Sequence, residues 1–117
     1  MRNIALAAMI ALLPFGGTTA HAHAFLDHAE PRVGSTVPSA PRQLSLWFTQ
    51  NLEPAFSSAD VQDANGARVD QGKAQISGAV MRVGLKPLPP GTYKVHWKVI
   101  SVDTHPTEGS FSFRVGK

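Results

Sequence analysis

Asp103 and His105 are the residues of this chain whose types and spacing most directly suggest chemistry, in the stretch VISVDTHPTEGSFSF. They are two positions apart, so an extended backbone would direct both side chains to the same side. An apolar strand end precedes them and Pro106 follows, which favours a rim or loop, where functional groups are commonly carried. A carboxylate beside an imidazole is half of a metal site. Taken alone, the pair is explained more simply by a turn in which Asp103 caps backbone amides and His105 faces water.

His23 is the candidate for the other half of such a site. A basic start, the apolar run IALAAMIALLPFGG and the small residues TTAHA are the three parts of a secretory signal peptide, and the run is too short for a convincing membrane span. We predict a signal peptide over residues 1–22, and cutting it after Ala22 leaves His23 with a free amine and an imidazole. A cut after Ala20 would instead leave HAH, whose amine, two backbone amides and third-residue imidazole bind Cu(II) locally, without the Asp-x-His pair.

The resulting donor set is rich in nitrogen. The amine and ring of His23, the ring of His105 and the carboxylate of Asp103 would give three nitrogens and one oxygen, which suits tetragonal Cu(II). The chain contains no cysteine, so thiolate ligands and disulfides are excluded. An α-amine has a pKa of about 7.7–8.0 and must lose its proton to bind, so we expect acid to weaken binding.

Length and charge exclude other classes of function. The net charge is +3, from 11 Lys and Arg against 8 Asp and Glu, and no basic run exists that would indicate nucleic-acid binding. Residues 23–117 suffice for one small domain and leave no room for a second. No Ser-His-Asp set or phosphate-binding glycine loop stands out. Metal binding therefore has the most support.

Alternating apolar residues indicate the strands that must position these groups. QLSLWF, TYKVHWKVISV and SFSFRV each place large apolar residues at every second position, as half-buried antiparallel strands do. Weaker candidates cover residues 25–29, 58–62 and 75–85, and DANGAR contains an Asn-Gly pair suited to a tight turn. The sequence predicts an all-β Greek-key sandwich or small barrel of about seven short strands.

Three stretches carry a family resemblance: HAFLDHAEPRVGSTV, LSLWFTQNLEPAFS and LPPGTYKVHWKVISVDTHPTEGSFSFRV. Through them, residues 23–117 resemble the periplasmic copper-binding CopC family. The resemblance implies an immunoglobulin-like Greek-key barrel that binds one Cu(II) per chain. In this chain His23 would supply an amine and an imidazole, His105 a third nitrogen and Asp103 an oxygen.

The resemblance also implies a role in the cell. We expect a periplasmic protein of copper resistance and homeostasis, which buffers copper or delivers it to an inner-membrane copper transport partner. We expect a monomer that is not an enzyme. Two alternatives stay open: an oxidative copper enzyme with a histidine brace, as in polysaccharide monooxygenases, and an immunoglobulin-like interaction module without metal function.

Two departures from the family pattern affect the expected chemistry. Some members place a Glu near the copper in an FSEN turn, where this chain has Gln50 in FTQN, which can still hydrogen-bond a bound water or ligand. Some members carry a methionine-rich Cu(I) segment, whereas residues 23–117 contain only Met81, so we predict binding of Cu(II) alone. We expect His28 and His96 not to be ligands.

Overall fold

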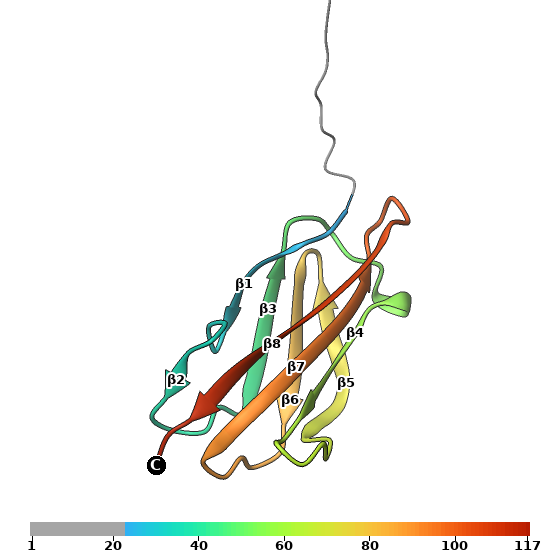
Figure 1. Ribbon diagram of the computed structural model, residues 1–117. Coiled ribbons are helices and arrows are strands. Elements are labelled where there is room, and N and C mark those ends of the chain that lie inside the picture. The colour runs from blue at the N-terminus through green and yellow to red at the C-terminus, as the bar shows by residue number, and fades with distance from the viewer. Residues whose placement is uncertain (1–22) are drawn as a thin grey trace, which may run out of the picture.

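The computed structural model describes residues 23–117, which form two four-stranded sheets packed face to face (Figure 1). The strand orders are β1-β3-β6-β5 and β2-β8-β7-β4. The all-β sandwich is therefore confirmed, with one strand more than expected because β2 has only two residues. The elements are β1 (Leu26–Glu30), β2 (Thr36–Val37), β3 (Gln43–Phe48), the 3-10 turn η1 (Pro54–Phe56), β4 (Ser58–Gln62), β5 (Asp70–Ser77), β6 (Val80–Leu85), β7 (Gly91–Ile100) and β8 (Pro106–Val115).

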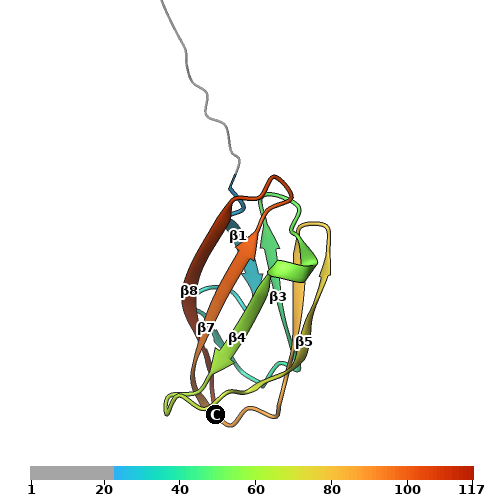
Figure 2. The ribbon, with the colours of Figure 1, turned by 90° about the vertical axis from the view of Figure 1, so that its right-hand side faces the viewer.

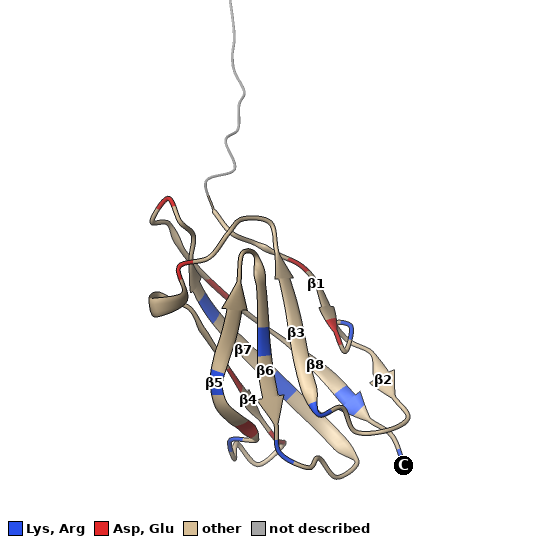
Figure 3. Cartoon of the chain, turned by 180° about the vertical axis from the view of Figure 1, so that it is seen from behind, with Lys and Arg blue, Asp and Glu red and all other residues tan. Residues whose placement is uncertain are grey.

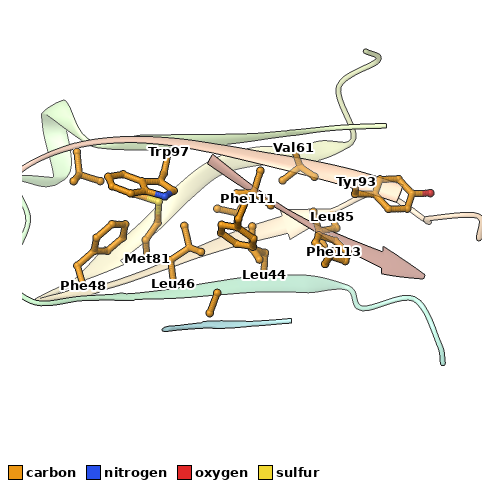
Figure 4. Close-up of a cluster of buried hydrophobic side chains, with 14 of the residues drawn as sticks. Leu44, Leu46, Phe48, Val61, Met81, Leu85, Tyr93, Trp97, Phe111 and Phe113 are labelled. Carbon is orange, nitrogen blue, oxygen red and sulfur yellow. The ribbon is translucent and has the colours of Figure 1, made fainter. Parts of the chain in front are cut away.

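The core lies between the sheets and is built from the alternating positions of the strands (Figure 4). In β3 the residues Leu44, Leu46 and Phe48 are buried, as their spacing predicts. Tyr93 and Trp97 belong to the matching inward series of β7. Burying a large apolar side chain contributes about 1.5–3 kcal/mol relative to leaving it exposed, which fixes the register of each strand. No helix within residues 23–117 combines the length and apolar character needed to cross a membrane.

The prediction of one strand over residues 75–85 is wrong, because this segment contains a hairpin. β5 ends at Ser77, and β6 begins at Val80 after a turn in which Gly78 has a φ of +61°. Glycine adopts this left-handed conformation without the clash that a Cβ atom would cause. The carbonyl of Gly78 also accepts the N–H of Leu52 at 3.0 Å, which ties the turn to the segment that follows β3.

Three segments meet at the end of the sandwich drawn uppermost in Figure 1: the chain before β1, the β3–η1 connection and the turn between β7 and β8. Figure 2 shows the same end from the side. The N–H of Glu53 donates to the carbonyl of Ile100 at 2.8 Å, and the N–H of Val102 donates to the carbonyl of Asn51 at 3.1 Å. These bonds fasten the β7–β8 turn to the connection from β3.

Candidate metal centre

The segment before β1 is fastened to both sheets, and His23 lies at its beginning. The N–H of Phe25 donates to Thr49 Oγ1 at 2.9 Å, and the N–H of Thr49 donates back to the carbonyl of Phe25 at 2.9 Å. The fully buried Ala24 accepts a hydrogen bond on its carbonyl from Thr107 Oγ1 of β8 at 2.6 Å. Because the two following residues are bonded in this way, the backbone of His23 is held at the rim of the sandwich.

The turn between β7 and β8, residues 101–105, carries the other two predicted ligands. Thr104 has a φ of 70°, in the left-handed region, and its N–H donates to the carbonyl of Ser101 at 2.8 Å. The N–H of Ser101 donates in turn to the carbonyl of His105 at 3.2 Å. Asp103 and His105 therefore project from a closed turn.

The tertiary structure brings the three predicted residues to one exposed rim. The ring centroids of His23 and His105 are 4.8 Å apart, with an angle of 45° between the ring planes. Asp103 Oδ1 lies 3.6 Å from His105 Nδ1, and these two side chains are 49% and 46% exposed. An imidazole from the start of the described chain thus lies beside an imidazole and a carboxylate from near its end.

Hydrogen bonding favours the ionised form of Asp103. The Ser101 hydroxyl donates to its Oδ1 atom, and this bond is the main reason why the pKa of Asp103 lies below its ordinary value. Partial burial opposes the shift, while the neighbouring His105 adds to it. In Figure 3 the tip of this turn is red and no part of the turn is blue, whereas Lys and Arg lie mainly along the strands and toward the opposite end. A metal cation at this rim would therefore meet a negative carboxylate.

Side chains alone do not complete a metal site. Within residues 23–117, no group of three His, Cys, Asp and Glu side chains is arranged to hold a metal ion. In the uncleaved chain the nitrogen of His23 is bound to Ala22 in a peptide bond, so it is not an amine. The predicted signal peptide, residues 1–22, and its cleavage lie outside the described residues. A donor set at this rim needs a further donor, and cleavage after Ala22 would supply the amine of His23.

Gln50 and Met81 have different positions relative to this rim. Gln50 is half-buried in the segment after β3, between Thr49, which bonds the N-terminal segment, and Asn51, which bonds the β7–β8 turn. Gln50 thus lies at the same end of the sandwich as the candidate ligands. Met81 is fully buried in the core, where its sulfur is inaccessible to an ion at the rim.

The other two histidines of the described chain have carboxylate partners of their own. His28 Nδ1 lies 2.7 Å from Asp27 Oδ2, and its ring stacks on Trp47 with centroids 4.4 Å apart. His96, on β7, has its Nε2 atom 2.9 Å from Glu108 Oε2. Neither arrangement brings these rings into contact with the candidate site.

Ser101 supports the candidate ligands and was not predicted from the sequence. Inward-facing residues occupy every second position of β7, and the series Trp97, Val99 leads directly to Ser101, which is completely buried. A serine at the next position of a series of buried apolar residues indicates an internal hydrogen bond, because a buried hydroxyl needs a partner. This pattern in the sequence could have identified Ser101. Thr49 and Thr107 gave no such signal, since their partners are distant in sequence.

The family model of the CopC domain matches residues 26–116. The chain belongs to the CopC family. It is 35% identical over 123 residues to copper resistance protein C of Xanthomonas campestris pv. juglandis, covering 97% of this chain and 96% of that protein. It is 34% identical over 113 residues to copper transport protein CutJ of Bacillus subtilis, covering 93% of this chain but only 21% of CutJ. This chain therefore spans about a fifth of the length of that relative.

A solved structure agrees with this assignment. The crystal structure of CopC from Methylosinus trichosporium OB3b superposes with a TM-score of 0.76 at 31% identity, covering 80% of this chain and 94% of that chain. The predicted family and β-sandwich fold are thus confirmed. Membership of the family supports a copper-binding role in copper resistance.

Proposed function

We propose that this protein, after cleavage behind Ala22, binds one Cu(II) ion through four donors. These are the amine and imidazole of His23, the imidazole of His105 and the carboxylate of Asp103. The observation that carries the proposal is the 4.8 Å separation of the His23 and His105 ring centroids. These two residues lie near opposite ends of the described sequence, yet their rings are adjacent in the structure. An amine and a ring on one residue form a chelate, and the nitrogen-rich set matches the preference of tetragonal Cu(II).

In this proposal copper is cargo, and the protein has no catalytic role. The ligands lie on an exposed rim, so the ion can leave by protonation of the amine, by ligand exchange or by reduction. Cu(I) prefers soft sulfur ligands, and the sulfur of Met81 is enclosed in the core. Reduced copper is therefore expected to leave the site.

The proposed setting is the periplasm, where the protein would act as a monomer. It would buffer copper or deliver it to a copper transport partner in the inner membrane. Support for such a partner comes from CutJ, a protein named for copper transport, in which a segment similar to this chain covers 21% of the length. The predicted signal peptide supports export.

The test is a Cu(II) competition titration of the secreted protein, with its N-terminus verified by mass spectrometry. A version whose N-terminal amine is acetylated loses the amine chelate but keeps the ring, so its affinity should fall by several orders of magnitude. His105→Ala should also weaken binding, because it removes one nitrogen ligand. His28→Ala is the matched control, since it removes an exposed imidazole that contacts Asp27 and Trp47 instead.

The titration also separates the alternatives. Equal affinities with and without the acetyl group would refute the role of the amine. If the His105→Ala protein binds Cu(II) with the affinity of the parent, the ion is held at the N-terminus alone or elsewhere, without the Asp103 and His105 turn, and the proposal fails.

A further inference from the structure

Ser101 is a completely buried polar residue directly beside the proposed copper ligands. Its exposed fraction is 0%, and the other buried serine of the described chain, Ser57, is 8% exposed. Ser101 occupies the first position after β7, where the inward-facing series of that strand reaches the β7–β8 turn. Its hydroxyl therefore points inward, beneath a turn whose ligand side chains are half exposed.

The hydroxyl of Ser101 contacts both residues that the turn offers to copper. It donates to Asp103 Oδ1, and it accepts the N–H of His105 at 3.4 Å. The backbone of Ser101 adds two bonds, from its N–H to the carbonyl of His105 at 3.2 Å and from the N–H of Thr104 to its own carbonyl at 2.8 Å. One buried residue thus joins the side chain of Asp103 to the main chain of His105.

A serine is well suited to this place. A hydroxyl has one hydrogen to donate and two lone pairs to accept with, which matches a carboxylate acceptor and an amide donor. Hydrogen bonds to an ionised carboxylate are about twice as strong as those between neutral groups. Removing the hydroxyl would leave the carboxylate of Asp103 and the N–H of His105 to bond water instead, on a turn whose ligand side chains are half exposed.

We propose that Ser101 is a positioning residue for copper, which holds the Asp103 carboxylate and the His105 backbone in the arrangement that receives the ion. This inference rests on the proposed Cu(II) site. Without Ser101, both ligands would lie on an exposed turn with greater rotational freedom, and the ion would have to order them when it binds. Partners that orient metal ligands typically change metal affinity by about 10–100-fold.

The test compares Ser101→Ala with Ser57→Ala in the cleaved protein. Ser57 is the matched control because its buried hydroxyl accepts the N–H of Ile100 at 3.1 Å, one residue before Ser101. Ser101→Ala should weaken Cu(II) binding by about 10–100-fold and change the copper hyperfine splitting in the electron paramagnetic resonance spectrum. Ser57→Ala should leave both unchanged, and Ser101→Thr, which keeps the hydroxyl, should restore the parent spectrum.

Parent-like affinity and spectrum in folded Ser101→Ala would overturn the inference, as would an equal loss in Ser57→Ala. If His105→Ala weakens binding but Ser101→Ala does not, this inference fails while the proposed function stands. If His105→Ala has no effect, both fail. Should Ser101→Ala not fold, hydrogen exchange of the parent decides: the His105 amide should be protected in the copper-free protein, and exchange at the rate of an open loop would overturn the inference.

Discussion

Gly109 of β8 is the position where a single methyl group should disturb the sandwich most directly. A Cβ atom placed there would lie 2.6 Å from Cζ2 and 2.9 Å from Cε2 of Trp97, which faces Gly109 on β7. Carbon atoms in favourable contact are about 3.5–4.0 Å apart, so the indole would have to move by about 1 Å. Trp97 is only 7% exposed, and its ring meets Phe48 edge-on at a centroid distance of 5.2 Å, so the indole has little room to move (Figure 4).

The expected cost follows from this crowding. Adding a methyl group to a well-packed core typically lowers the free energy of unfolding by about 1–3 kcal/mol. For a domain of this size each kcal/mol lowers the Tm by about 4–8 °C. We therefore expect Gly109→Ala to unfold at a clearly lower temperature than the parent, with Trp97 displaced.

Thermal unfolding followed by circular dichroism measures this difference. Gly116→Ala is the matched control, because its Cβ atom would meet the carbonyl oxygen of Val37 at 3.5 Å and Thr36 Cγ2 at 3.7 Å, which are ordinary contacts. Its Tm should stay close to that of the parent. A Gly109→Ala protein as stable as the parent would show that the indole can move without loss, and would refute the claim that Trp97 is fixed.

Three further predictions concern charge and copper. Arg68 donates to both carboxylate oxygens of Asp70 at 2.8 Å, and this bonding is the largest cause that lowers the Asp70 pKa. The stabilisation of the folded protein by this ion pair is therefore present above the unfolded pKa of Asp70, about 3.9, and is lost as the pH falls through the lower pKa of the folded state. Arg68→Ala should lower the free energy of unfolding at neutral pH and lower it progressively less in acid, as measured by urea unfolding. Copper titrations of His28→Ala and His96→Ala should give the parent affinity, and a large loss in either would add a ligand to the proposed set. A Cu(I) competition assay should find no tight complex, because Met81 is buried, and tight binding would contradict that expectation.

Much of the fold was predictable because alternation along a strand is a local property. The buried series of β3, β7 and β8 appear in the sequence as apolar residues at every second position, and each proved to face the core. The hairpin at Gly78 was missed because the apolar positions on both sides of it continue almost without interruption. A turn of this kind depends on one left-handed residue, which leaves little trace in the hydrophobic pattern.

The candidate site divides in the same way between sequence and tertiary structure. The sequence by itself determined the kinds of donor, the absence of thiols and the shared turn of Asp103 and His105, because composition and short spacing are local. Only the tertiary structure decided that His23 lies beside His105, since that contact depends on hydrogen bonds joining the N-terminal segment to both sheets. It also decided that the hydroxyl of Ser101 is enclosed beneath the turn, because burial depends on the packing of strands that are distant in the chain.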